Sequence, residues 1–368
     1  MDRSFRVLDA DVSLSGPEPV VGPIAAAYAR FATAPHSAES GSRIEFVPGP
    51  GGAIRIEDRS EPVIDTAEPV LQLYRAFLTT IFARIGHHAL LHAAAVERTG
   101  TGAILIAAPA GHGKSSLTME LIRRGFRFLS DDYAPVDLTT GTVSPYPRTV
   151  GVISGGSAPI PDEVRRIVDD PATPKLFGKS LVDPGRAFGE AAIATKPVPV
   201  RHVIALTSEL ESSGRPETTW LDVWVRAESA PRLRDAVEAL NGVDVVEARE
   251  GPGVHAWRLR LEHARQPTAA LSPILDDEAI LYTEKFWGAR PGFDGAPEAH
   301  PMERMDTAIH LGREMLNRRR GCRFVDRYEG NVARLFVDLV GSLTDARCSR
   351  VRVGRFADTI DLVESLVA

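Results

Sequence analysis

Residues 103–124, AILIAAPAGHGKSSLTMELIRR, constrain the fold of this chain more than any other segment. The first eight are small and apolar, as in a buried strand, and the last ten have helical spacing. Between them, Gly111 and Gly113 allow the backbone to curl, and Lys114 and Ser115 follow directly. A glycine-rich turn between a strand and a helix offers several N–H donors to a phosphate group, assisted by the positive helix end. The segment therefore predicts an α/β fold with a nucleotide-binding loop.

The loop matches the pattern G-x-x-x-x-G-K-[ST] except at Ala108, where the first glycine is expected. An alanine there is tolerated if its φ is negative and strained if its φ is positive. A chance GKS in an ordinary loop is the alternative, but the flanking strand and helix favour phosphate binding. Lys114 would reach the β- and γ-phosphates, Ser115 would ligate Mg²⁺, and His112 would fill space. The expected nucleotide-binding residues are Ala110, Gly111, His112, Gly113, Lys114, Ser115, Ser116, Arg148 and Lys179.

A pair of acids, Asp131 and Asp132, follows the short strand FRFLS at residues 126–130. The helix before that strand spans about 15 Å and the strand returns about as far. In a right-handed βαβ unit the second parallel strand ends at the same edge as the first, where ligands bind. Asp131, with Ser115, is assigned to the metal, and which of the two acids accepts a proton from an attacking hydroxyl stays open. A solvated acidic turn is the alternative for such a pair.

The stretch LLHAAAV at residues 90–96, followed by residues 103–137, resembles the catalytic core of the HPr kinase/phosphorylase family. The resemblance implies a mixed-sheet core similar to that of phosphoenolpyruvate carboxykinase, and phosphorylation of a seryl hydroxyl in a protein or peptide with ATP and Mg²⁺. It implies that His92 positions a phosphate or the acids, although a half-buried strand histidine is the alternative. The catalytic residues implied in this way are His92, Lys114, Asp131 and Asp132.

The resemblance is confined to part of the chain. The Glu-Ile-Arg-Gly segment of the bifunctional enzymes is not recognisable, so the reverse phosphorolysis is not expected, and residues 1–85 do not resemble their regulatory domain. Some relatives phosphorylate precursor peptides of natural products, and the chain fits such a specialised kinase. The family also implies a homo-oligomer.

Two further candidates for binding the phosphates lie in Pro- and Gly-rich segments: Arg148 in PYPR and Lys179 in FGKS. For both residues, ordinary surface placement is the alternative.

Hydrophobic patterns divide the chain into four regions. The regions are an N-terminal α+β segment (1–85), a phosphate-loop kinase core (86–207), a βαββ module (208–265) and a mostly helical region that completes the fold (266–368).

The net charge of −6 and the pI of about 6.0 favour neither nucleic acid nor a membrane surface as a partner. Two cysteines without CxxC spacing argue against zinc and disulfides, and the N-terminus lacks an apolar leader. The most apolar 20-residue stretch, 77–96, carries an arginine and three histidines, which is incompatible with a membrane span. A cytoplasmic protein is expected.

Two other functions share the phosphate loop. One is a P-loop NTPase or a kinase of a small metabolite, although the chain has neither an NKxD-like nor an LSGGQ-like motif. The other is a non-catalytic protein that senses nucleotides or acts as a scaffold, which a defective loop at Ala108 would favour. Neither is excluded by the sequence.

Overall fold

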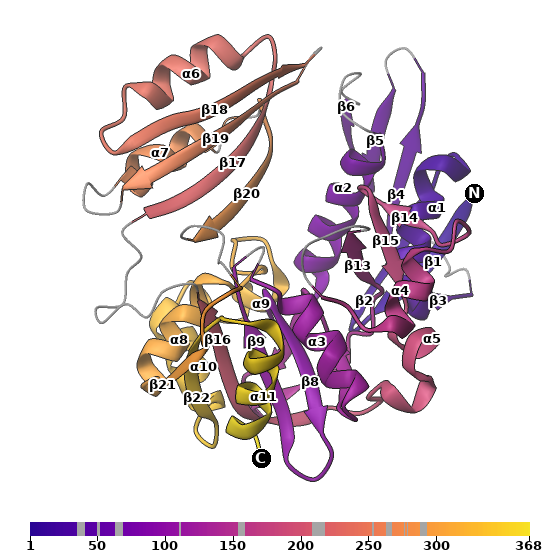
Figure 1. Cartoon of the computed structure of the whole chain (residues 1–368). Coiled ribbons are helices and arrows are strands. Elements are labelled where there is room, and N and C mark those ends of the chain that lie inside the picture. Colours follow the sequence, from indigo (N-terminus) through magenta and orange to yellow (C-terminus); the bar gives the residue numbers. More distant parts are fainter. Residues whose placement is uncertain are drawn as a thin grey trace.

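The computed structural model describes residues 1–34, 41–49, 52–62, 69–109, 112–153, 159–207, 218–251, 254–262, 267–275, 277, 279–287 and 293–368. Within them, four β-sheets and their helices form a mixed α/β protein. Figure 1 shows the N-terminal sheet and a separate sheet carrying α6 and α7 as two lobes above the central sheet. No helix in these ranges is both long enough and apolar enough to cross a membrane.

The central sheet has the order β10-β8-β9-β16-β12-β11-β7, with β22 paired to β16 and β21 paired to β22. Its middle strands β9, β16 and β22 are parallel, whereas β8 is antiparallel to both β9 and β10. The strands are β7 (Ala89–Leu91), β8 (Ala93–Arg98), β9 (Gly102–Ala107), β10 (Arg127–Ser130), β11 (Ala134–Asp137), β12 (Thr142–Val143), β16 (Val198–Thr207), β21 (Glu298–Pro301) and β22 (Arg347–Arg352).

Helices cover both faces of this sheet because alternate strand residues are apolar on each side. Ile104 and Ile106 of β9 face α3 (Lys114–Arg123) and α11 (Phe356–Leu366). Leu105 and Ala107 face the other layer, made of α8 (Arg304–Arg313), α9 (Arg323–Asp326) and α10 (Val332–Ser342). The region 266–368, expected to be mostly helical, contains α8, α10 and α11.

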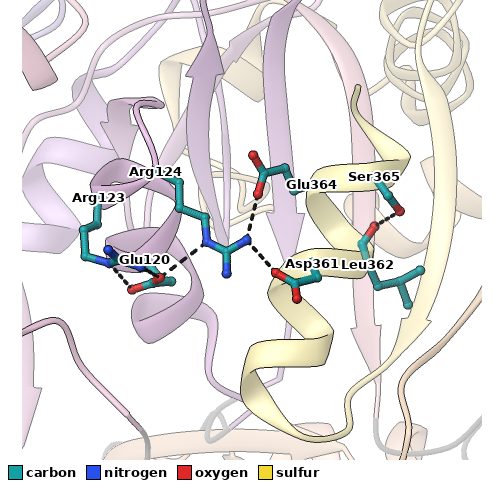
Figure 2. Close-up of polar contacts among 7 residues, drawn as sticks. All are labelled: Glu120, Arg123, Arg124, Asp361, Leu362, Glu364 and Ser365. Carbon is teal, nitrogen blue, oxygen red and sulfur yellow. Dashed lines mark hydrogen bonds and ion pairs between the residues drawn. The ribbon is translucent and has the colours of Figure 1, made fainter.

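One charged cluster joins α3 to α11 on the first face. Figure 2 shows Arg124 between Glu120 of its own helix and two acids of α11. Its guanidinium lies 2.6 Å from Asp361 and 2.8 Å from Glu364. The C-terminal helix is therefore fastened to the helix that follows the phosphate loop.

The N-terminal unit contains a six-stranded sheet of order β3-β1-β2-β4-β5-β6, and α1 and α2 pack on it. Alternating apolar residues form the hairpin β4–β5, and an apolar stripe at helical spacing forms α2, in line with the α+β segment expected for residues 1–85. The elements are β1 (Asp2–Val7), β2 (Ala10–Ser15), α1 (Glu18–Ala27), η1 (Ala29–Phe31), β3 (Ala32–Thr33), β4 (Ser42–Val47), β5 (Ala53–Ile56), β6 (Arg59–Pro62) and α2 (Pro69–Arg84).

Between β12 and β16 the chain forms a three-stranded sheet of order β13-β15-β14 with short helices. Arg30 of the N-terminal unit reaches this segment and pairs with Asp183 at 2.8 Å and Glu190 at 2.6 Å. The elements are β13 (Val150–Ile153), α4 (Asp162–Val168), β14 (Lys175–Leu176), β15 (Lys179–Val182), α5 (Pro184–Phe188) and η2 (Glu190–Ala192).

A βαββ module was expected over residues 208–265, and the structure forms a larger unit in this part of the chain. Strand β20 pairs with β17, which completes a βαββαβ unit of order β18-β19-β17-β20, the ferredoxin-like arrangement. The module therefore runs past residue 265, and three strands, β20 to β22, lie in the region expected to be mostly helical. Its elements are β17 (Thr218–Arg226), α6 (Ala230–Glu238), β18 (Val243–Gly251), β19 (Val254–Glu262), α7 (Pro267–Leu275) and β20 (Ile280–Trp287).

Candidate active site

The candidate phosphate loop connects β9 to α3 at the carboxyl edge of the central sheet. Gly113 caps α3 with a left-handed φ of 79°, a conformation that favours glycine. Ala108 is not among the residues with positive φ, so the alanine at the first-glycine position brings no backbone strain. Ala110 and Gly111 lie outside the described residues. The described part of the loop therefore places a helix N-terminus, a position where anions can bind, at this edge of the sheet.

Asp131 and Asp132 follow the last residue of β10. Strand β10 runs in the same direction as β9, as expected, but the two are not neighbours because β8 lies between them. In a simple βαβ unit β10 would pair with β9. Here β8, the hairpin partner of β9, occupies that position in the sheet. Both carboxyl ends still lie at one edge of the sheet, so the acids come out beside the first turn of α3.

Two contacts link the acids to the residues after the loop glycines. The Ser115 hydroxyl donates a hydrogen bond to Oδ2 of Asp131 at 3.0 Å. Nζ of Lys114 lies 3.2 Å from Oδ1 of Asp132. Asp131 is 4% exposed, whereas the side chain of Asp132 is 34% exposed. The buried acid thus faces the hydroxyl, and the more accessible acid faces the ammonium group.

Arg148 joins this cluster from the loop before β13. Its Nη2 donates to Oδ2 of Asp132 at 2.8 Å, and its Nη1 donates to the hydroxyl of Tyr74 at 2.7 Å. The guanidinium also lies over the ring of Tyr133, 4.8 Å from the centroid. Asp132 consequently has a cation on each of its oxygens.

His92 lies between β7 and β8, where the strand expected to be continuous is interrupted. Its backbone N–H donates to the carbonyl of Glu314 at 2.9 Å, and its Nδ1 lies 3.4 Å from the Glu314 carboxylate. The side chain is 32% exposed. Glu314 therefore fixes both the backbone and the ring of His92. Sequence reasoning missed Glu314 because it lies 222 residues away and carries no motif.

The surroundings of the two acids shift their pKa values in opposite directions. Burial, and then the adjacent charge of Asp132, raise the pKa of Asp131 to about 6. Burial would also raise the pKa of Asp132, but the charges of Lys114, Arg148 and His92 outweigh it and hold that pKa well below its usual range. Asp132 is ionised at neutral pH, and Asp131 is the acid that a nearby cation would stabilise most.

The remaining candidates are His112, Ser116 and Lys179. His112 and Ser116 are buried beside the loop, and the His112 N–H donates to the carbonyl of Pro109 at 3.3 Å. Lys179 is exposed at the start of β15 and runs over Gly151, where an added Cβ would lie 3.1 Å from its Cδ. Among the described contacts of Lys179, none joins it to the acids.

The residues present fit a magnesium nucleotide. Oδ1 of Asp131 is buried and has no hydrogen-bond partner within the described ranges, although buried carboxylate oxygens are normally paired. A carboxylate and a hydroxyl are ligands that Mg²⁺ accepts while keeping phosphate and water oxygens as its other ligands. The described residues contain no group of three or more His, Cys, Asp or Glu that would hold a metal by themselves.

Fold and site together define a mixed α/β protein with a candidate phosphate site at the edge of its central sheet. No family model matches the chain. The chain is similar to two proteins named HPr kinase/phosphorylase, from Limosilactobacillus reuteri (strain DSM 20016) and from Limosilactobacillus reuteri subsp. reuteri (strain JCM 1112). Each is 32% identical over 80 residues, which are 22% of this chain and 25% of the relative. The resemblance noticed in the sequence is thereby confirmed, and it spans a quarter of the relatives' length.

Two solved structures show partial likeness. One is the Hpr(Ser) kinase/phosphatase from Coxiella burnetii, with a TM-score of 0.24 and 18% identity over 35% of this chain and 74% of that chain. The other is the C-terminal domain of the MgtC protein from Mycobacterium tuberculosis, with a TM-score of 0.17 and 13% identity over 23% of this chain and 98% of that chain. Both TM-scores are low, and neither structure defines the overall fold.

Proposed function

We propose that this protein is a kinase that transfers the γ-phosphoryl group of ATP to a serine or threonine hydroxyl of a protein or peptide. One observation carries the proposal. The two residues that follow the loop glycines each contact one of two adjacent acids, Lys114 at 3.2 Å and Ser115 at 3.0 Å. The relatives named HPr kinase/phosphorylase support the same class of reaction.

Each residue of the cluster has a distinct role in this proposal. The backbone at Gly113 and the ammonium of Lys114 would bind the phosphates, and Ser115 with Asp131 would hold Mg²⁺. When bound, Mg²⁺ would neutralise the negative charge that develops on the phosphates during transfer. Asp132, ionised at neutral pH, orients the acceptor hydroxyl and takes its proton.

The ion pair between Lys114 and Asp132 explains how the acid becomes available. Phosphates bound at the helix N-terminus compete with Asp132 for the ammonium group of Lys114. As the ammonium turns toward them, Asp132 loses one of the cations that depress its pKa, so its carboxylate becomes a better base. Arg148 remains in contact with Oδ2 of Asp132 and keeps the carboxylate oriented.

The acceptor is a narrower part of the proposal. A precursor peptide of a natural product is the acceptor that we favour, because the chain adds a ferredoxin-like module and shows no Glu-Ile-Arg-Gly segment. The cytoplasmic location and a homo-oligomeric assembly remain predictions.

The test is incubation with labelled ATP, Mg²⁺ and peptides encoded beside the gene, followed by mass spectrometry to locate the phosphate. We expect a phosphorylated serine or threonine. Lys114→Ala should abolish transfer, and Asp132→Asn should slow it about 100-fold or more while ATP still binds. Transfer at the parental rate by either variant would show that the site is wrongly assigned.

The same assay separates the two alternatives. Steady hydrolysis of ATP without any acceptor, or transfer to a small metabolite, would identify a different P-loop enzyme. Tight ATP binding without transfer, unchanged in Asp132→Asn, would identify a nucleotide sensor. The unstrained Ala108 removes the sequence feature that favoured a sensor.

A further inference from the structure

We propose that Tyr74, on helix α2 of the N-terminal unit, is a positioning residue that holds Arg148 against Asp132. The N-terminal unit would then be a working part of the site. This inference rests on the kinase function proposed above, and it assigns a role to residues 1–85, which do not resemble the regulatory domain of the HPr kinase/phosphorylase family.

The guanidinium of Arg148 has one hydrogen-bond partner at each of its two terminal nitrogens. One side of the guanidinium donates to Asp132 at 2.8 Å and the other donates to Tyr74 at 2.7 Å. The Arg148 side chain is 11% exposed, so it has little water to replace a lost partner. A buried cation without full hydrogen bonding is costly, and the Tyr74 hydroxyl therefore limits the positions that Arg148 can adopt.

Aromatic rings enclose the same guanidinium. It lies 4.8 Å from the ring centroid of Tyr133 and 6.0 Å from that of Tyr28. Tyr74 is itself held in place, because its ring packs edge-on against Phe177 with centroids 5.4 Å apart. Rings with few rotatable bonds form a rigid support, so the hydroxyl of Tyr74 is presented at a fixed point.

The segment that carries Arg148 is anchored to the N-terminal unit as well. The backbone N–H of Thr149 donates to the carbonyl of Ala27 at 3.2 Å. Arg30 adds its ion pairs to Asp183 and Glu190. A displacement of the N-terminal unit would thus move Arg148, and with it the carboxylate proposed to orient the acceptor hydroxyl.

Tyr74→Phe isolates the hydroxyl, because phenylalanine keeps the ring against Phe177. We expect kcat for phosphoryl transfer to fall about tenfold, the effect of one hydrogen bond to a charged group, while KM for ATP changes less than about twofold. Tyr146→Phe is the matched control. It removes a hydroxyl from the same aromatic cluster, but that hydroxyl donates its hydrogen bond to Tyr28 at 3.4 Å, whereas Tyr74 accepts one from Arg148. The control should keep the parental kcat.

A double-mutant cycle shows whether Tyr74 acts through Arg148. In an Arg148→Ala background, Tyr74→Phe should lower kcat no further. Arg148→Lys serves as a second background if the alanine variant folds poorly. A parental kcat in Tyr74→Phe, or the same tenfold loss with and without Arg148, would overturn the inference.

The cycle also distinguishes this inference from the proposed function. If the parent protein phosphorylates no acceptor, the kinase proposal fails, and the same four proteins are then compared by denaturant unfolding. Non-additive effects of Tyr74→Phe and Arg148→Ala on the unfolding free energy would still support the positioning contact, and additive effects would reject it.

Discussion

Ser115 donates its hydroxyl hydrogen to Asp131 across 3.0 Å, from the first turn of α3 to the residue after β10. This hydrogen bond joins the two residues expected to hold Mg²⁺. It occupies one carboxylate oxygen and leaves the buried Oδ1 of Asp131 without a partner in the described part of the chain. The unpaired buried oxygen is the feature that a bound cation would satisfy.

Removal of the hydroxyl should weaken the response to magnesium. In Ser115→Ala we expect the Mg²⁺ concentration that half-saturates nucleotide binding to rise about tenfold, because one ligand is lost. Ser115→Thr keeps a hydroxyl at the position where the motif accepts either residue, and it should stay within about threefold of the parent. Calorimetric titration of nucleotide at several Mg²⁺ concentrations measures both. Equal values for the alanine and threonine variants would contradict the ligand role.

The raised pKa of Asp131 should make stability depend on pH in metal-free buffer. Between about pH 4 and pH 6 the unfolded chain has released this proton while the folded protein retains it. The free energy of unfolding therefore loses a contribution of about 2 kcal/mol as pH rises through this window. Asp132 has the opposite effect on the free energy of unfolding, and at lower pH. Because its pKa is depressed in the folded protein, it contributes stability that is lost as the pH falls below the ordinary pKa of an aspartate.

Asp131→Asn cannot titrate, so it isolates this contribution. Relative to the parent, the variant should become more stable as pH rises from 4 to 6, by about 1–3 kcal/mol in urea unfolding with a chelator present. A stability difference that does not change with pH would show that Asp131 has an ordinary pKa.

The left-handed backbone at Gly113 predicts that an alanine at this position weakens nucleotide binding. Gly113→Ala should lower the free energy of unfolding by about 1–2 kcal/mol, because alanine is strained at this positive φ. The added Cβ itself has room, since the Phe293 ring lies 3.6 Å away. Gly100→Ala is the control: its φ is 82°, nothing lies within 4 Å of an added Cβ, and it sits in the distant β8–β9 turn. Both should unfold alike, whereas only Gly113→Ala should bind ATP more weakly. Equal ATP affinities would place the phosphates elsewhere.

The Arg124 cluster of Figure 2 predicts a loss of stability. Arg124→Ala breaks contacts to Glu120, Asp361 and Glu364 at once and should lower the unfolding free energy by about 1–2 kcal/mol. Arg123→Ala loses, among the described contacts, the pair between its exposed side chain and the buried Glu120. Because Arg124 still pairs with Glu120, this change should cost less than about 0.5 kcal/mol. Denaturant unfolding of both variants measures the difference. Similar small losses would mean that the cluster does not fasten α11.

Local patterns predicted the parts of the fold that depend on neighbouring residues. The helix α2, the hairpin β4–β5 and the β17–α6–β18–β19 run all follow from hydrophobic period and turn residues. The edge at which Asp131 and Asp132 emerge was also predictable, because it depends only on strand direction.

Contacts between distant segments were not predictable in this way. Period and turn chemistry do not say that β8 separates β9 from β10, or that β20 closes the module against β17. The partners of the site show the same limit, since Glu314 reaches His92 over 222 positions and Tyr74 reaches Arg148 over 74. Such pairs follow from the packing of whole units, which one sequence does not encode locally.

The parallel pairing of β16 with β22 has a consequence for synthesis of the chain. His202 of β16 lies opposite Arg347 and Thr207 lies opposite Arg352, so the partner strand is translated 145 residues later. Until the ribosome has passed that point, one hydrogen-bonding side of β16 has no strand to cover it, next to apolar residues such as Val203 and Ile204. Truncated or stalled products of this gene should therefore aggregate, and chaperone dependence should end only when β22 has emerged.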